Sequence, residues 1–150
     1  MKRLRIYIDT SVIGGCLDSE FAEQSEALLE MGRRGDVMLL VSDLLADELA
    51  RAPDEVQARL GSISRDRLEP IVRSPEAERL RDAYLEAGVV GPSSANDALH
   101  VAIATTADAD VIVSWNFQHL VHLEKIRGFN AVNLREGYGL IEIRSPREVI

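Results

Sequence analysis

The chain has 150 residues, of which 46% are hydrophobic and 28% charged, a composition typical of one globular domain rather than of a disordered or fibrous protein. Its formal net charge of −8 argues against a nonspecific nucleic-acid binder, because such proteins are normally basic. The single cysteine, Cys16, excludes an internal disulfide and a cysteine-rich zinc module. No linker or internal repeat divides the sequence, so we expect one domain over residues 1–150.

The N-terminal segment has basic residues followed by a short apolar run, which is the order found in secretory signals. Asp9 interrupts this run too early for a signal peptide, and no stretch approaches the roughly 18 apolar residues of a membrane span. We therefore expect a cytoplasmic protein with no membrane partner. The lone cysteine fits a reducing compartment, and the acidic charge suits a protein whose binding groove is completed by a basic partner.

The N-terminal half of the chain predicts strands that alternate with helices. β-branched and aromatic residues form a short run that stops at Asp9, which is typical of a buried strand. Gly35 can end a helix, Ser42 can cap the next one, and Pro70 places its strand at the edge of a sheet. The predicted elements are strands over 4–8, 37–41 and 68–72, and helices over 21–34, from Ser42 to Pro53, and over 54–60.

The C-terminal half continues this alternation. Pro75 begins a charged helix that ends before Gly88, and the helix after Ser94 is apolar on most of its circumference, as helices buried against a sheet are. Strands that alternate with helices imply βαβ crossovers, so the pattern predicts an α/β fold with a parallel sheet covered on both faces. The further predicted elements are a strand over 111–113, a helix over 120–126, and strands over 131–134 and 140–143, the last at an edge.

Asp9 directly follows the first predicted strand and is itself followed by Thr10 and Ser11. Asp and Ser are common in caps and turns, so a structural role is one interpretation. Open α/β sheets, however, place their ligands outside the carboxyl ends of the strands. A carboxylate at that position indicates a functional site.

Two further acidic residues, Glu48 and Asp97, have two interpretations each. Glu48 lies inside the helix after the second strand, where glutamate is common. Asp97 follows Ser94 by three residues, so it fits a capping box as well as a metal site. A carboxylate at the start of an apolar, buried helix is costly unless it is paired or bound to a metal. The local pattern does not decide between these interpretations.

The fourth strand ends in Ser114 and Asn116, whose side chains bring further oxygen atoms to the same edge of the sheet. Hard oxygen ligands without cysteine suit Mg²⁺ or Mn²⁺ better than zinc. Carboxylates gathered at strand ends could hold one or two such ions, which polarise a phosphate, activate a water and neutralise the leaving oxygen. We interpret Trp115, between them, as a core residue rather than a base-stacking platform.

Four segments, in order, resemble the PIN domain, especially the VapC-like toxins of toxin–antitoxin pairs: IYIDTSVIGG, SDLLADE, NDALHVAIAT and VIVSWNF. The resemblance spans nearly the whole chain and implies a three-layer α/β/α fold with a central, mainly parallel sheet. It also implies a Mg²⁺- or Mn²⁺-dependent ribonuclease with an RNA substrate, a cognate antitoxin and a homodimeric state. The family's acidic positions match Asp9, Glu48 and Asp97, and Ser11 matches the hydroxyl that follows the first.

Asn116 departs from the family pattern, because many PIN domains carry a further aspartate after the fourth strand. Asparagine can coordinate a metal weakly or orient a water, but it supplies no charge. This departure puts a second metal in doubt and supports a rival interpretation, a degenerate PIN domain that binds RNA or a partner without cutting. Metal binding would discriminate between the two, because millimolar Mn²⁺ should raise the melting temperature only if the acids form a site.

Other motifs give alternative interpretations. His100, one helical turn after Asp97, is a candidate metal ligand, a residue that supports a metal ligand, an RNA contact or a packing residue. An aspartyl phosphotransferase would normally carry a second aspartate where Ser11 stands. Gly14 and Gly15 are interpreted as a flexible turn, since they form no dinucleotide-binding fingerprint. The predicted catalytic residues are Asp9, Glu48, Asp97, Asn116 and Ser11, with Asp9, Asp97 and Glu48 as metal ligands.

Overall fold

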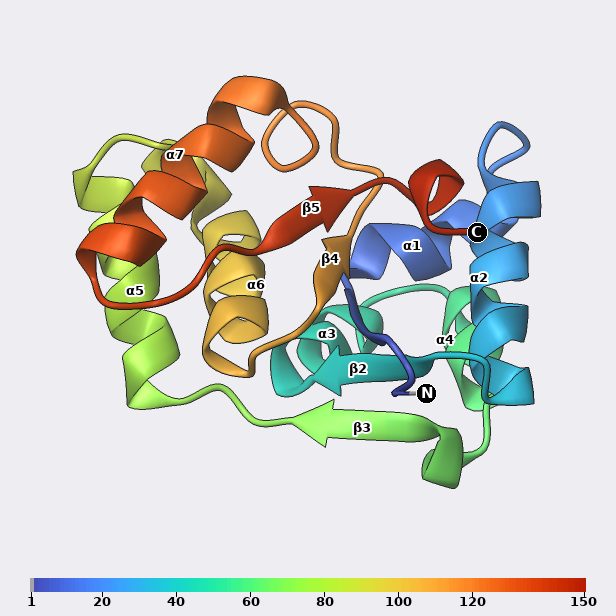
Figure 1. Ribbon diagram of the computed structural model, residues 1–150. Coiled ribbons are helices and arrows are strands. Elements are labelled where there is room, and N and C mark those ends of the chain that lie inside the picture. Colours follow the sequence, from blue (N-terminus) through green and yellow to red (C-terminus); the bar gives the residue numbers. More distant parts are fainter. Residues whose placement is uncertain (1) are drawn as a thin grey trace.

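The computed structural model describes residues 2–150 as a central sheet with helices on both faces (Figure 1). Five parallel strands lie in the order β3-β2-β1-β4-β5. The predicted three-layer α/β/α fold is confirmed, with a sheet that is wholly parallel. Within residues 2–150, no helix has the length and apolar composition needed to cross a membrane. The strands are β1 (Arg5–Ile8), β2 (Met38–Ser42), β3 (Leu68–Ile71), β4 (Val111–Val113) and β5 (Glu142–Arg144).

The strand order places a topological switch beside β1. From β1 the chain adds β2 and β3 on one side of the sheet, and it then returns to add β4 and β5 on the other. Because the strands are parallel, the carboxyl ends of β1, β2 and β4 lie along the same edge. Ligand sites in open α/β sheets lie at this edge, where the strand order reverses. The fold thus brings together the residues that follow Ile8, Ser42 and Val113.

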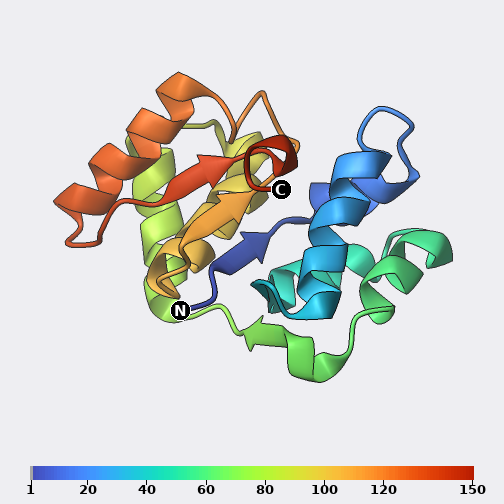
Figure 2. The same cartoon turned by 45° about the vertical axis from the view of Figure 1, so that its right-hand side comes forward.

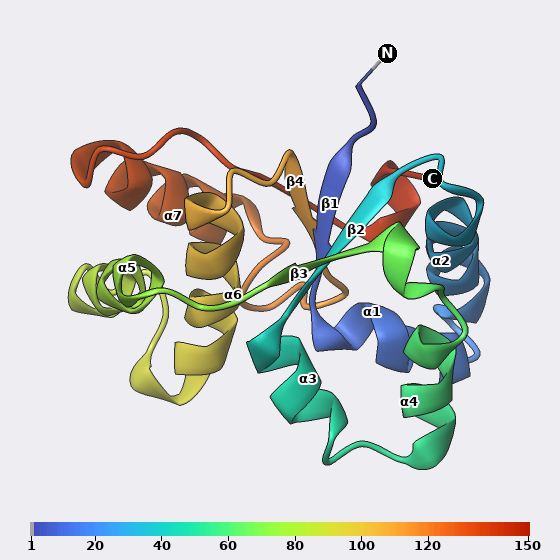
Figure 3. The same ribbon diagram turned by 90° about the horizontal axis from the view of Figure 1, so that it is seen from below.

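The side chains of β1 alternate between two hydrophobic cores, one on each face of the sheet. Tyr7 belongs to one core, whereas Ile6 and Ile8 belong to the other, and all three are fully buried. Figures 2 and 3 show the two helical layers from other directions. The layer on the Tyr7 side contains α5 (Pro75–Glu86), α6 (Ala95–Thr106) and α7 (Leu123–Arg135), and the opposite layer contains α1 (Thr10–Gly14), α2 (Ala22–Arg34) and α4 (Asp54–Gly61).

Several element boundaries follow the signals in the sequence. Ser42 accepts a hydrogen bond from a backbone N–H at 3.1 Å and begins α3 (Asp43–Leu49). Ser74 caps α5 in the same way, and Gly35, at φ 79°, ends α2 in the left-handed conformation that favours glycine. The predictions that Pro70 lies in an edge strand and that a further edge strand lies near residue 140 are also confirmed.

The strand predicted over 131–134 is wrong, because these residues belong to α7. The helix predicted over 120–126 begins at Leu123 instead and continues to Arg135. Phe129 and Val132 are buried three residues apart, whereas Leu134 is 60% exposed, which is the pattern of one helical face. A short apolar run does not distinguish a strand from a buried helix segment, and here packing against α5 decides for the helix.

The flexible turn predicted at Gly14 and Gly15 is also wrong. Gly14 ends α1, and Gly15 begins a 3₁₀ turn over Gly15–Leu17. A Cβ atom at Gly15 would lie 2.6 Å from Oγ of Ser25 and 2.7 Å from Nε1 of Trp115. Trp115 is only 6% exposed and donates a hydrogen bond to Ser25, so it is the core residue that the sequence predicted. Gly15 is therefore required for close packing.

Gly15→Ala should lower the free energy of unfolding by about 1–3 kcal/mol, because the added methyl group would clash with the buried pair of Trp115 and Ser25. Gly14→Ala is the matched control: nothing lies within 4 Å of its added methyl group, so we expect no loss of stability. Urea unfolding, followed by the fluorescence of the single tryptophan, measures both. Equal stability of the two variants would contradict the packing role of Gly15.

Candidate functional site

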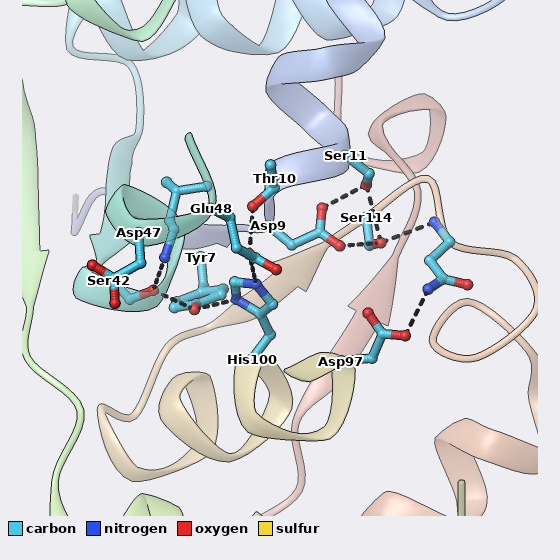
Figure 4. A network of polar contacts seen from close by, with 12 residues as sticks. Tyr7, Asp9, Thr10, Ser11, Ser42, Asp47, Glu48, Asp97, His100 and Ser114 are labelled. Atoms are coloured by element: carbon cyan, nitrogen blue, oxygen red, sulfur yellow. Dashed lines mark hydrogen bonds and ion pairs between the residues drawn. The ribbon is translucent and has the colours of Figure 1, made fainter. Parts of the chain in front are cut away.

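Asp9 follows β1 directly and lies between two serine hydroxyls. Its backbone begins α1, but its side chain makes no cap hydrogen bond. Ser11 donates to one carboxylate oxygen and Ser114, at the end of β4, donates to the other, each at 2.6 Å (Figure 4). Asp9 is only 4% exposed, and burial raises the pKa of its carboxyl group although the two hydroxyls oppose this shift.

Asp97 lies in the first turn of α6, on the other side of the site from Asp9. The capping box considered from the sequence is not formed, because the N–H of Ser94 donates to the carbonyl of Gly91. The Asp97 carboxylate instead accepts a hydrogen bond from Nδ2 of Asn116 at 3.2 Å. Burial and the negative charge of Asp9 raise the pKa of Asp97. The two aspartates are therefore close enough to repel each other electrostatically.

Glu48 lies in α3, which begins at the carboxyl end of β2, and two donors hold its carboxylate. The hydroxyl of Thr10 and Nε2 of His100 each lie 2.6 Å from Oε1. Burial opposes the ionisation of Glu48, but these hydrogen bonds outweigh it and lower the pKa of its carboxyl group. The protein therefore favours the charged form of Glu48, whereas burial disfavours the charged forms of Asp9 and Asp97.

His100, one turn after Asp97, contacts protein atoms through both ring nitrogens. Nδ1 lies 2.6 Å from the hydroxyl of Tyr7, and Nε2 lies 2.6 Å from Glu48. The residue is only 2% exposed. In this arrangement neither nitrogen is free for a metal ion or RNA, so the geometry opposes direct metal ligation and RNA contact and leaves His100 a role through its partner Glu48.

Asn116 turns its amide nitrogen, rather than its oxygen, towards Asp97. Oδ1 of Asn116 accepts a hydrogen bond from the backbone N–H of His119 at 2.9 Å, which leaves Nδ2 to donate to Asp97. Asn116 thus orients Asp97 as an N–H donor, whereas the sequence predicts an oxygen directed at a metal or its waters. Ser11 has a similar orienting position, because its hydroxyl donates to Asp9 and accepts from the N–H of Trp115 at 2.9 Å.

Tyr7 and Thr10 belong to this polar network, although the sequence pattern does not identify them as site residues. The Tyr7 hydroxyl contacts both Oγ of Ser42, at 2.8 Å, and His100. A tyrosine in an otherwise apolar, buried strand needs a polar partner for its hydroxyl. This need is the one feature of the sequence that could have indicated a polar network at Tyr7. Thr10 carries no such signal apart from its position after Asp9.

No lysine or arginine of residues 2–150 balances the charge of Asp9 and Asp97, although His100 favours the ionised form of both and His119 that of Asp97. Neither aspartate forms an ion pair with a lysine or arginine of residues 2–150, whereas Asp43 and Glu69 each pair with an arginine. Burying carboxylates without a cationic partner is costly, and a divalent cation would offset both the burial and the mutual repulsion.

The donor atoms around the two aspartates fit a hard divalent cation, because they are carboxylate and hydroxyl oxygens with no thiolate among them. In the part of the chain that the structure describes, residues 2–150, no group of three or more His, Cys, Asp or Glu side chains is arranged to hold a metal ion. Glu48 is held by Thr10 and His100 instead. The chemistry of Asp9 and Asp97 thus suits Mg²⁺ or Mn²⁺, with Glu48 set apart from them.

The family model of the PIN domain matches residues 5–118, which include Asp9, Glu48, Asp97 and Asn116. The chain belongs to the PIN domain family. No curated protein matches this PIN domain in sequence.

Solved structures share the fold of this PIN domain. A chain of VapBC2 from Rickettsia felis, bound to a DNA fragment from its promoter, has 16% identity and a TM-score of 0.59, covering 95% of this chain and 98% of that chain. A chain of DNA-bound VapBC from Salmonella typhimurium has 18% identity and a TM-score of 0.58, with the same coverages of 95% and 98%. A chain of FitAcB from Neisseria gonorrhoeae has 17% identity and a TM-score of 0.57, again covering 95% and 98%. The predicted VapC-like PIN fold is confirmed.

The raised pKa of Asp97 predicts that its charge destabilises the PIN domain when no metal is bound. A folded-state pKa above the unfolded value makes the ionised form costly, so the cost is absent in acid and grows as the pH rises through the folded-state pKa. Asp97→Asn should therefore resist urea better than the wild type near neutral pH in EDTA. The difference should shrink in acid.

Asp43→Asn is the control with the opposite sign. Burial disfavours the charge of Asp43, but hydrogen bonds and charge from Arg73 outweigh burial and lower the pKa of its carboxyl group. The stabilisation by the pair of Asp43 and Arg73 is present at neutral pH, and it is lost as the pH falls through the lowered pKa of Asp43. Asp43→Asn should thus destabilise the protein at neutral pH, and destabilisation by both variants would contradict the unbalanced charge at Asp97.

Proposed function

We propose that this PIN domain is a divalent-metal-dependent endoribonuclease that hydrolyses RNA phosphodiester bonds, as a VapC-like toxin. The observation that carries the proposal is the pair of Asp9 and Asp97, two carboxylates without a lysine or arginine partner in residues 2–150, at the switch point of a parallel sheet. Membership of the PIN domain family supports nuclease chemistry at this pair. An RNA substrate would locate the activity in the cytoplasm.

The chain's own residues would prepare the site for the ion. Asp9 and Asp97 would hold Mg²⁺ or Mn²⁺, and Glu48 would be a further ligand or the base that orients the attacking water. When bound, the ion would polarise the phosphate, lower the pKa of a water and neutralise charge on the leaving oxygen. Ser11 keeps Asp9 in its orientation, and Asn116 does the same for Asp97.

The number of ions follows from the charge that the site can supply. Asn116 contributes an N–H donor and no charge, and Glu48 is engaged by Thr10 and His100. The proposal therefore requires at least one ion, between Asp9 and Asp97, and does not depend on a second.

The proposed partners are a small cognate antitoxin that blocks the site and a second copy of this chain. Support for the antitoxin comes from the fold, which resembles chains found in VapBC and FitAB structures bound to DNA. The acidic net charge of −8 suits a basic partner segment at the groove.

A second candidate function is a degenerate PIN domain that binds RNA or a partner without cutting. Asn116 is the observation that favours it, because a carboxylate is missing there. The unbalanced pair of Asp9 and Asp97 opposes it, since a binding module has no need for two repelling acids.

Cleavage of a panel of structured RNAs tests the proposed activity. The wild type should cut in Mn²⁺ and not in EDTA, and Asp97→Asn should lose at least about 100-fold in rate, because the site loses one of its two main charges. Asp43→Asn, a charge loss at a residue paired with Arg73, should cut like the wild type. Identical behaviour of wild type and Asp97→Asn in every condition would exclude the proposed chemistry.

Thermal unfolding in millimolar Mn²⁺ discriminates between the two candidate functions. Binding to the folded state raises the melting temperature in proportion to ln(1 + [Mn²⁺]/Kd), so the wild type should shift and Asp97→Asn should not. A wild type that does not shift would favour the binding module.

A further inference from the structure

A continuous row of buried hydrogen bonds leads to Glu48 from the start of α3. Oγ of Ser42 lies 2.8 Å from the hydroxyl of Tyr7, which lies 2.6 Å from Nδ1 of His100. Nε2 of the same ring lies 2.6 Å from Oε1 of Glu48, and Figure 4 shows the row from end to end. Its members come from β1, β2, α3 and α6, so tertiary structure alone assembles it.

The partners of each atom define the direction of the row. The hydroxyl of Ser42 accepts a hydrogen bond from the N–H of Leu45 and can still donate to Tyr7, which is the direction required when the proton of Tyr7 goes to His100. Tyr7 then donates to Nδ1 of His100, which leaves the ring proton on Nε2. From there it is donated to the carboxylate of Glu48. In the opposite neutral tautomer, the lone pair of Nε2 would face the negative oxygen of Glu48, which is unfavourable.

The row is shielded from water along its length. Tyr7 is fully buried, and Ser42 and His100 are 3% and 2% exposed. Water cannot replace a lost partner at such positions, so each hydrogen bond matters for the next one. Only Glu48, whose side chain is 30% exposed, reaches the open site.

The two oxygens of Glu48 have different surroundings. Oε1 accepts from both His100 and Thr10. Oε2 has no hydrogen-bond partner among the atoms of residues 2–150, and Figure 4 shows the free oxygen on the side of Asp9. One oxygen is thus anchored to the fold while the other stays available.

We propose that Tyr7 and His100 are positioning residues, which anchor Oε1 of Glu48 so that Oε2 stays free on the Asp9 side of the site, where it would orient a water at the cation held by Asp9 and Asp97. This inference rests on the proposed function, because it assigns a role towards the proposed ion. Neither Tyr7 nor His100 touches the ion or the RNA, and both act through Glu48. Carboxylates in and around metal sites are commonly held by hydrogen bonds of this kind, and losing these bonds weakens metal affinity.

Tyr84 offers a matched control for Tyr7. It is also fully buried, its hydroxyl donates to the side chain of Asn133, and its ring packs edge-on against Phe129 at 4.9 Å. Tyr7→Phe and Tyr84→Phe therefore each remove one buried hydroxyl that is hydrogen-bonded to polar side chains, two for Tyr7 and one for Tyr84. Only Tyr7 is connected to Glu48, so a general loss of stability would affect both variants whereas a positioning role separates them.

The first experiment titrates Mn²⁺ against wild type, Tyr7→Phe and Tyr84→Phe, with calorimetry as the binding readout and RNA cleavage as a second one. Tyr7→Phe should need about ten-fold more Mn²⁺ for half-saturation and should lower kcat with little change in KM. Tyr84→Phe should match the wild type in all three quantities. Equal Mn²⁺ affinity of the two variants would overturn the proposal.

The second experiment uses two replacements of His100 that differ in reach. In His100→Gln, the amide nitrogen would lie near the position that Nε2 of the histidine occupies, so it can donate to Glu48. In His100→Asn, the side chain is shorter and its amide nitrogen would lie near the position of Nδ1, so it cannot reach Glu48. His100→Gln should therefore retain more Mn²⁺ affinity than His100→Asn. If both variants lose the same affinity, a merely structural role is sufficient and the proposal is overturned.

The outcomes separate this proposal from the function on which it rests. A wild type that neither binds Mn²⁺ nor cuts RNA would overturn both. A wild type that binds Mn²⁺ and cuts RNA, together with a Tyr7→Phe variant that does so equally well, would overturn the positioning role alone.

Discussion

Two hydroxyl groups donate to the buried carboxylate of Asp9, and the parallel sheet brings those two hydroxyls together. Ser11 belongs to the first turn of α1, and Ser114 follows β4, a strand that pairs with β1 although it lies 105 residues later in the chain. Without these donors the buried carboxylate would lose two of the hydrogen bonds that replace its contacts with water, and its burial would cost more. The register between β1 and β4 is therefore a condition for the whole site.

The three acids of the site are held in two different ways. Glu48 has a lowered pKa because hydrogen bonds from His100 and Thr10 outweigh its burial, whereas Asp9 and Asp97 have raised pKa values because burial dominates. One acid is thus stabilised in its charged form by the protein, whereas burial disfavours the charge of the other two, which the proposed cation would stabilise. This division separates a residue suited to orienting a water from residues suited to holding an ion.

Much of the architecture could be predicted because local signals and tertiary packing agree. Ser42 caps α3, Gly35 ends α2, and β1 stops at Asp9, as their local sequences require. The prediction of a strand over 131–134 failed because a run of four residues contains too little periodicity to distinguish a strand from a helix. The prediction of a flexible turn at Gly15 failed because the sequence does not show what the glycine packs against. Its neighbour Trp115 lies 100 positions away, and only the fold brings the two into contact.

By itself, the sequence determined the kind of chemistry available, since it placed carboxylates and hydroxyls directly after apolar strands, and parallel strands end along a shared edge. It could not determine which partner each polar atom takes. His100 bonds to Tyr7 across 93 positions and to Glu48 across 52, and the orientation of Asn116 depends on a backbone N–H in the loop that follows it. Hydrogen bonds act over about 3 Å, so these choices exist only after the strands and helices have packed.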